Sequence, residues 1–274
     1  MLEYKNLNAI IGYPLEHSQS PLLHNRVYQS LNIPAVFLAF PCSQLKPLVQ
    51  AIKTLSIGLT AVTMPFKQEV LSYLEECSPE AQALKAANTI IQREGKLYGY
   101  NTDIDGIAYA LRDTMVAGKN VLILGAGGAA RALGYFMQSN NAELFWLNRT
   151  QENGLKMVKD FGGEVLTPKQ AYKEQAYRGS VDIIVNTTPM GMYPDMNVSP
   201  LPDYPFHPAQ TVFDLVYNPR ETLLLKQAQK AGAKIISGMD MFIAQGLKQI
   251  ELWRGIKLAE ENLINDIKVL LLSQ

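Results

Sequence analysis

Short apolar runs alternate with stretches of helical spacing along the first hundred residues. The pattern predicts strands over residues 8–12, 35–40 and 58–63, and helices over 20–31, 43–55 and 67–76. Residues 89–103 then read as a hairpin, because two β-rich pieces flank a glycine-bearing turn, and 104–115 return to helical spacing. The pattern predicts one complete α/β unit.

A second alternation begins at residue 120. It predicts strands over 120–125, 142–148, 181–187, 211–216 and 233–237, with a helix over 128–139. The proline-rich segment 189–210 has no period and indicates a long loop, and helical stretches at 239–253 and 257–272 close the chain. We therefore expect an α/β protein of two domains, whose final helices return to the first domain.

The composition narrows the class of protein. The chain has 274 residues, which suits two domains of ordinary size, and its 25 basic and 25 acidic residues balance. No overall charge draws it to nucleic acid or to an anionic membrane, so any bound anion must be held locally. Cys42 and Cys77 lie far apart without metal-ligand spacing. With no apolar span or leader pattern, a soluble, cytoplasmic protein is expected.

A glycine-rich turn follows the strand predicted at 120–125. Gly125, Gly127 and Ala130 form the pattern G-x-G-x-x-A, with Gly128 and Ala129 inside it, between a strand and a helix. Such a turn lets a pyrophosphate approach the backbone amides at a helix N-terminus. The alternative is a glycine turn that serves packing alone. The strand and helix on either side favour a dinucleotide-binding, Rossmann-type domain.

The end of the next strand bears on the choice of dinucleotide. NAD-binding folds place Asp or Glu there for the ribose hydroxyls, whereas this chain has Asn148, Arg149 and Thr150. A guanidinium and hydrogen-bond donors suit the 2′-phosphate of NADP. Arg149 could instead be a solvated residue at a helix start. NADP is the predicted cofactor.

Two serines stand at the end of the first predicted strand. Ser20 before Pro21 predicts an N-cap, and Ser18 beside it could complete an anion site for a substrate carboxylate. His17 and His24 do not predict zinc, because no third ligand stands at a suitable spacing. No metal site is expected, and no G-x-S-x-G elbow indicates a serine hydrolase.

Further polar residues follow other strands of the first unit. Thr63 and Lys67 flank a proline after one strand, and Asn88 and Asp103 stand on either side of the hairpin. Ligands collect beyond the carboxyl ends of strands in open α/β sheets, so these residues could share one site. Alternatively, Lys67 is a surface charge and Asp103 a helix cap.

Taken together, the motifs resemble those of the shikimate dehydrogenase family along nearly the whole chain. They are, in order, GYPLEHSQSPLLHN, VTMPFK, NT at 88, GYNTDIDG, GAGGAAR, NRT, NTTPMGM, DLVYNPRETLLL and GMDMFIAQ. The resemblance implies a substrate domain over 1–102 plus 239–274 and an NADP-binding Rossmann domain over 103–238, separated by a cleft.

The resemblance also implies roles for individual residues. Lys67 and Asp103 match the catalytic pair, and Ser18 and Ser20 match the residues that hold the shikimate carboxylate. Thr63, Asn88 and Gln245 match residues that bind ring hydroxyls, and Tyr217 one that lines the substrate site. The matches to cofactor contacts are Gly125, Gly127, Gly128, Ala129, Ala130, Asn148, Arg149, Thr150, Thr187, Met190 and Gly238.

Some positions depart from the family pattern. Ala61 replaces the usual Asn, Ala86 a common Gly, and Phe242 the usual Leu. Asn153 stands where a second Arg often follows NRT, which could soften the preference for NADP, although Lys156 could partly replace it.

The resemblance implies reversible, NADPH-dependent reduction of 3-dehydroshikimate to shikimate in aromatic amino-acid biosynthesis. Hydride transfer to a ketone builds charge on its oxygen, so an acid and a cation are needed, and Lys67 beside Asp103 can supply both. Which of the two carries the exchanged proton stays open. Two alternatives remain, a quinate/shikimate dehydrogenase with relaxed use of NAD and NADP, and a non-catalytic NADP-sensing protein. We expect a monomer or a homodimer that binds small molecules.

Overall fold

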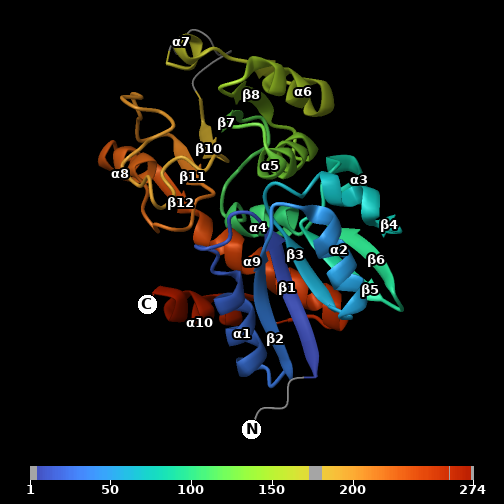
Figure 1. Ribbon diagram of the computed structural model, residues 1–274. Helices are drawn as coiled ribbons and strands as arrows, with labels where there is room; N and C mark the ends of the chain where they lie inside the picture. Colours follow the sequence, from blue (N-terminus) through green and yellow to red (C-terminus); the bar gives the residue numbers. More distant parts are fainter. Residues whose placement is uncertain (1–4, 173–180, 259, 273–274) are drawn as a thin grey trace. The chain divides into compact units, whose positions relative to one another are not determined.

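The computed structural model describes residues 5–172, 181–258 and 260–272 (Figure 1). The chain forms two compact units, Met1–Gly106 with Ile243–Gln274 (unit 1) and Ile107–Phe242 (unit 2). It passes from one to the other within helix α4 (Asp103–Ala110) and returns within helix α9 (Gly238–Arg254). Both units contain strands and helices, as the sequence predicts.

The sheet of unit 1 has the strand order β2-β1-β3-β5-β6-β4. Its strands are β1 (Asn6–Gly12), β2 (Ala35–Pro41), β3 (Leu59–Val62), β4 (Glu76–Cys77), β5 (Thr89–Arg93) and β6 (Lys96–Tyr100). Strands β2 and β3 flank β1 in parallel, and β5 is antiparallel to both of its neighbours. The β5–β6 hairpin confirms the prediction for 89–103, and the sheet is mixed.

Helices cover both faces of this sheet. Ala9 and Ile11 of β1 point toward α2 (Leu45–Thr54) and share its core, while Asn8 points the other way and donates to the Tyr28 hydroxyl of α1 (Ser20–Ser30). Helix α9 packs against α1, where Gly246 contacts Leu23. The remaining helices of unit 1 are α3 (Pro79–Leu84) and α10 (Glu260–Leu272).

Two local predictions for unit 1 are wrong. Residues 67–76 form a short 3₁₀ helix, η1 (Glu69–Tyr73), followed by β4, because Glu75 hydrogen-bonds Leu97 through backbone and side chain and joins the sheet edge. Ser20 is the first helical residue and Gln19 occupies the N-cap without a side-chain bond. Instead, the Ser18 hydroxyl accepts a hydrogen bond from the Ser20 amide at 3.4 Å.

Unit 2 is a parallel sheet in the order β12-β11-β10-β7-β8-β9. Its strands are β7 (Asn120–Leu124), β8 (Glu143–Leu147), β9 (Glu164–Val165), β10 (Ile183–Asn186), β11 (Thr211–Asp214) and β12 (Lys234–Ser237). Its helices are α5 (Gly128–Ser139), α6 (Gln151–Phe161), α7 (Pro168–Ala171) and α8 (Leu223–Lys230). This confirms the predicted Rossmann-type domain.

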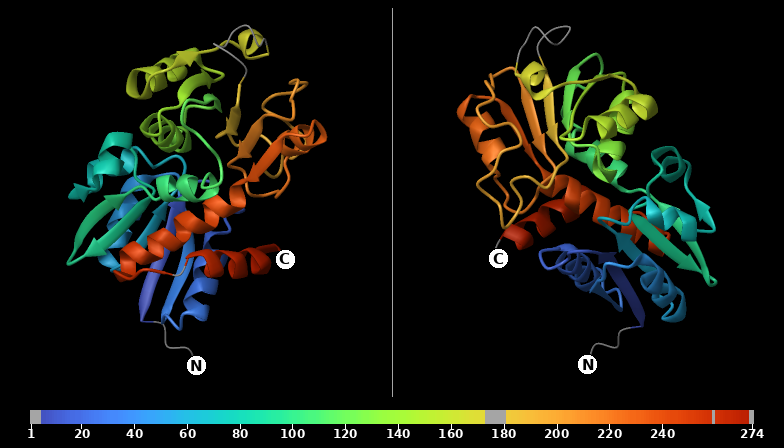
Figure 2. Two further views of the ribbon diagram at one scale, coloured as in Figure 1. Left: turned by 180° about the vertical axis from the view of Figure 1, so that it is seen from behind. Right: turned by 45° about the horizontal axis from the view of Figure 1, so that its top comes forward.

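The helices of unit 2 lie on opposite faces of its sheet (Figure 2). Gly134 of α5 packs against Trp146 of β8, whereas Phe145, the adjacent residue, shares a core with Leu224 and Leu225 of α8. The predicted loop at 189–210 contains turns and bends only. Across the residues described, none of the helices has the length and apolar character that a membrane crossing requires.

Candidate active site

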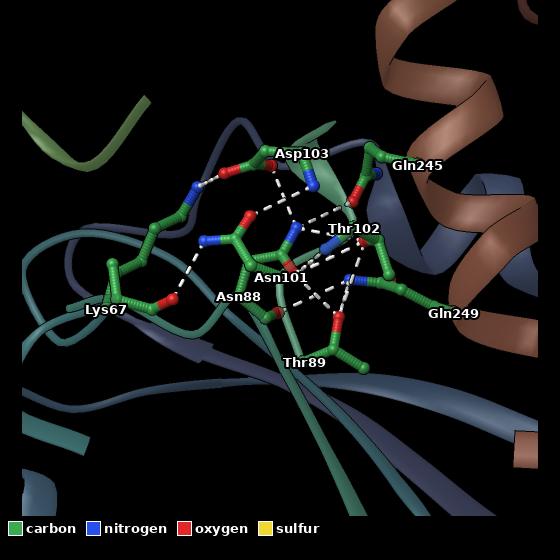
Figure 3. Close-up of polar contacts among 9 residues, drawn as sticks. Lys67, Asn88, Thr89, Asn101, Thr102, Asp103, Gln245 and Gln249 are labelled. Atoms are coloured by element: carbon green, nitrogen blue, oxygen red, sulfur yellow. Dashed lines mark hydrogen bonds and ion pairs between the residues drawn. The ribbon is translucent and has the colours of Figure 1, made fainter. Parts of the chain in front are cut away.

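Lys67 and Asp103 form an ion pair in unit 1. Lys67 follows β3 in a turn anchored by the buried Phe66, and Asp103 is the first residue of α4. The Lys67 Nζ lies 2.6 Å from Asp103 Oδ2, with side-chain exposures of 16% and 6% (Figure 3). Lys67 is therefore not a solvated surface charge. Little water screens this pair, so its charges act strongly on any group that binds beside it.

Asn88 fixes the orientation of the Asp103 carboxylate. Its amide Nδ2 donates to Asp103 Oδ1 at 2.8 Å and to the Thr102 hydroxyl at 3.0 Å. Its Oδ1 accepts from the Thr102 amide and from the Thr89 hydroxyl. Only 2% of Asn88 is exposed, so this saturated network leaves its amide little freedom to turn. Lys67 and Asn88 both hydrogen-bond to Asp103, so these three side chains lie together.

Backbone contacts place the same residues. The Ala87 amide donates to the Lys67 carbonyl at 2.8 Å, which ties the lysine turn to the segment that carries Asn88. Asn101 donates to the Ala86 carbonyl and accepts from the Asp103 amide. Sequence reasoning missed Asn101 and Thr102 as parts of the site, although both stand in the GYNTD motif.

Four of the other residues expected to bind substrate lie in unit 1. Gln245 of α9 brings its Oε1 to 3.5 Å from Asn88 Nδ2. Thr63 follows β3 and is half-buried, and its amide donates to the carbonyl of Ile11. Ser18 is half-buried and Ser20 buried, at the start of α1. These hydroxyls and amides provide donors and acceptors suited to a polyhydroxylated acid.

The glycine turn of unit 2 combines a glycine of positive φ with open space beside the backbone. Gly125 has φ +107°, and a Cβ there would lie 2.6 Å from the Thr187 hydroxyl. A Cβ at Gly127, by contrast, would meet no atom within 4 Å, so the backbone faces open space. Helix α5 begins at Gly128 without a side-chain cap. These features fit a pyrophosphate on the helix N-terminus.

The residues after β8 leave a cation exposed. Arg149 and Thr150 are exposed, and Asn148 Nδ2 donates to the Thr150 carbonyl at 2.8 Å, which shapes the turn. In the first turns of α6, the Lys156 ammonium lies 3.4 Å from Asn153 Oδ1. A second cation thus stands near the position where the family often has Arg.

A buried carboxyl links the ends of β10 and β11. Asp214 accepts from Asn186 Nδ2 at 2.9 Å, from the Thr222 hydroxyl at 2.6 Å and from the Val216 amide at 3.0 Å. Burial is the main influence on this group and raises the pKa of Asp214 to about 6, although the three hydrogen bonds oppose it. Sequence reasoning missed both Asn186 and Asp214.

This carboxyl supports the loops that carry other predicted residues. Asn186 accepts from the Thr188 amide and hydroxyl and donates to the Met190 carbonyl at 3.3 Å. Thr187 donates through its hydroxyl to the Leu124 carbonyl at 2.7 Å, and the Met190 side chain is exposed.

Two more of the predicted residues lie beyond β11 and β12. Tyr217 stacks on Phe242 with ring centroids 4.2 Å apart. Gly238 begins α9 so close to the carbonyl of Leu215 that a side chain would collide with it. Packing alone therefore requires glycine at position 238, whether or not a cofactor binds there.

The described residues contain no cluster of three His, Cys, Asp or Glu that could hold a metal ion. His24, one of the two histidines considered for zinc, is buried and hydrogen-bonded within the core instead.

Comparison with known proteins decides the family. Residues 10–90 match the model of the shikimate dehydrogenase substrate binding domain. The shikimate dehydrogenase (NADP(+)) of Carboxydothermus hydrogenoformans is 37% identical, covering 91% of this chain and 92% of that protein. The chain belongs to the shikimate dehydrogenase family. The corresponding enzyme of Pyrococcus furiosus is 40% identical over 90% of this chain and 89% of that protein.

Solved structures of the family share the fold. Shikimate 5-dehydrogenase of Thermus thermophilus, in complex with NADP(H) and shikimate, has a TM-score of 0.84, is 31% identical and covers 95% of this chain and 97% of its own. The enzyme of Listeria monocytogenes, in complex with shikimate and NAD, has a TM-score of 0.82 at 30% identity and covers 96% of both chains. Family members have thus been solved with either dinucleotide.

Proposed function

We propose that this protein is an NADP-dependent shikimate dehydrogenase, which reduces 3-dehydroshikimate reversibly to shikimate in the shikimate pathway of aromatic amino-acid biosynthesis. Unit 1 binds the substrate and unit 2 binds NADP(H). The observation that carries the proposal is the shielded Lys67–Asp103 pair, held by Asn88 within a chain of this family. A protein that only senses NADP has no need of such a pair.

Lys67 is the acid of the reaction. When NADPH is bound, it would supply a hydride to the ketone carbon, and the carbonyl oxygen, which gains charge, would need a proton. The Lys67 ammonium donates that proton and stabilises the charge as it develops. The Asp103 carboxylate accepts a hydrogen bond from the Asn88 amide through Oδ1 and from Lys67 through Oδ2. It orients the ammonium and accepts a hydrogen bond from a substrate hydroxyl.

The remaining residues of unit 1 bind and orient the substrate. Ser18 and Ser20 donate to its carboxylate at the start of α1, where the amides of the first helical turn add favourable partial charge. Thr63 and Gln245 bind ring hydroxyls, and Tyr217 is a further residue of the proposed substrate site. Asn88 acts mainly by fixing Asp103, since its amide is already saturated.

Unit 2 holds the cofactor through its backbone and one cation. The open space at Gly127 receives the pyrophosphate, and Gly128, Ala129 and Ala130 present the first amides of α5. Arg149, with Asn148 and Thr150, binds the 2′-phosphate, while Thr187, Met190 and Gly238 lie toward the nicotinamide. No acidic residue at 148–150 repels that phosphate.

Relaxed use of NAD and NADP, with activity on quinate, is the second candidate. Asn153 replaces a common Arg, which favours it, and Lys156 beside Asn153 opposes it. The test is the absorbance of the nicotinamide during oxidation of shikimate or quinate with NADP or NAD. Shikimate turnover with NADP at least about tenfold faster than with NAD supports the proposal, since a charge-assisted hydrogen bond contributes that much. Equal turnover with both cofactors supports the second candidate, and no turnover indicates the sensor.

A further inference from the structure

His24 is a fully buried polar side chain one helical turn beyond Ser20. Its exposure is 0%, and its ring stacks on Phe37 with centroids 3.9 Å apart. Nδ1 lies 2.9 Å from the Ser20 carbonyl oxygen, and Nε2 lies 3.1 Å from Oε1 of Gln249 on α9. One side chain thus links the start of α1 to a second helix of unit 1.

Gln249 continues this link toward the reacting groups. Its Nε2 donates to the Asn88 carbonyl at 3.3 Å and to the Thr89 hydroxyl at 3.0 Å, and only 1% of the residue is exposed. A carbonyl can only accept, so the amide orientation is fixed and Oε1 faces His24. Figure 3 shows this half of the network, which reaches Asp103 through Asn88.

The ring of His24 is held by packing as well as by a hydrogen bond. Both of its nitrogens face acceptor oxygens, but burial lowers the pKa of His24 to about 4, so the ring is neutral at pH 7 and donates to one of them. Gly246 brings α9 close, since a Cβ there would lie 3.5 Å from His24 Cε1 and 2.5 Å from Leu23. The position of α1 against α9 is therefore specified at this point.

We propose that His24 and Gln249 are positioning residues that fix the serine end of the substrate site relative to its reacting end. The serine end is Ser18 and Ser20, and the reacting end is Asn88 and Asp103. This inference rests on the proposed function. The carboxylate and the ketone of 3-dehydroshikimate belong to one small ring, so both ends engage it together only if their separation is held constant.

Variants of similar shape remove one of the two His24 contacts, to Ser20 or to Gln249, at a time. In His24→Asn the amide takes the place of Nδ1 and keeps the Ser20 contact, whereas in His24→Gln it takes the place of Nε2 and keeps the Gln249 contact. Gln249→Met removes the link from the other side at similar volume. We expect kcat/KM for shikimate at saturating NADP to fall about tenfold in the variants, with the KM for NADP unchanged.

A double-mutant cycle distinguishes positioning from general destabilisation. In a Ser18→Ala/Ser20→Ala background no serine hydroxyl remains to be placed, so the same substitutions should lower kcat/KM less than about twofold. Tyr28→Phe is the matched control, because it removes another buried hydrogen bond of α1, 2.7 Å to Asn8. It should lower stability and leave kcat/KM unchanged.

The outcomes separate this role from the proposed function. Equal losses in both backgrounds, or an equal loss in Tyr28→Phe, overturn the positioning role while wild-type turnover keeps the proposed function. An inactive wild-type protein overturns both. Circular dichroism establishes that each variant is folded, and Gln249→Met decides the question if a His24 variant is not.

Discussion

Lys67 is the residue on which the proposed chemistry depends most directly. An ion pair as shielded as Lys67–Asp103 contributes little net stability, because desolvation of two charges offsets most of their attraction. Function is a better reason for its presence. The Lys67 ammonium stabilises the negative charge that develops beside it, on the oxygen of the ketone, during hydride transfer.

Replacing Lys67 by Ala should lower kcat by between about 10² and 10⁴, the usual effect of losing a general acid, with little change in the KM for shikimate. Steady-state rates with saturating NADP measure both constants. Lys53→Ala serves as control, since Lys53 forms a 2.9 Å ion pair with Glu75 at exposures of 42% and 35%. A variant at Lys67 that turned over normally would remove the lysine from the mechanism.

Arg149 should determine the preference between the two dinucleotides. Arg149→Ala should lower kcat/KM with NADP by about tenfold to hundredfold, because a charge-assisted hydrogen bond to phosphate is lost, and should leave the value with NAD unchanged. Lys159→Ala, an exposed cation in the last turn of the helix that follows, provides the comparison. If NADP and NAD were affected equally, the guanidinium would not contact the 2′-phosphate.

Elements of unit 2 are joined by Asp214, whose carboxyl binds Asn186 at the end of β10 and Thr222 before α8. Because burial raises its pKa to about 6, the folded protein keeps this proton at pH values where the unfolded chain, near 3.8, has lost it. As pH rises from about 4 to about 6, this group should therefore lower the free energy of unfolding by roughly 2 to 3 kcal/mol. Above pH 6 the contribution becomes constant.

Asp214→Asn should abolish that pH dependence, since an amide can still accept from Asn186 and bond Thr222. Urea unfolding followed by tryptophan fluorescence measures the free energy of unfolding of unit 2 at each pH. Trp146 lies in unit 2, and Trp253→Phe removes the second tryptophan. The difference between proteins with and without the Asp214→Asn substitution isolates the contribution of the carboxyl. If the free energy of unfolding changed equally between pH 4 and pH 6 with and without Asp214→Asn, the pKa of Asp214 would not be raised.

The periodicity of apolar residues predicted most helices and strands, whereas it did not predict local hydrogen bonds. The β5–β6 hairpin and the parallel order of unit 2 follow from turn residues and apolar runs. Residues 67–76 resemble a helix, but the pairing of Glu75 with Leu97 depends on a strand about twenty residues away. The sequence Ser20-Pro21 likewise resembles an N-cap, because residue spacing alone does not show that the Ser18 hydroxyl accepts from the Ser20 amide.

The candidate site was predictable as a set of residue types and unpredictable as a network. Polar residues after strands indicated Lys67, Asn88 and Asp103, since strand ends collect ligands. The family resemblance predicts that Asn88 binds substrate, but it does not show that the Asn88 amide also donates to Thr102 and Asp103. The sequence did not indicate the contact between Gln249 and His24, because buried side chains far apart in sequence meet only after folding.

At the scale of the whole molecule, the chain divides inside helices α4 and α9, not at helix ends. Asp103 begins α4 yet bonds to Lys67 and Asn88 of unit 1, and Phe242 lies in α9 yet stacks on Tyr217 of unit 2. Each unit has its own core and holds most of the predicted contacts to one ligand.

Each ligand should therefore protect a different unit from hydrogen exchange. NADP alone at about 100 times its Kd should slow exchange up to about 100-fold at 125–130 and 148–150, and shikimate alone should do so at 18–24 and 63–67. Mass spectrometry of peptides resolves these segments. Gly127→Val is the control, because its backbone is unstrained and a Cβ there meets no atom, so the variant should fold normally and yet exclude the pyrophosphate. Protection of 125–130 by NADP in that variant would place the cofactor elsewhere.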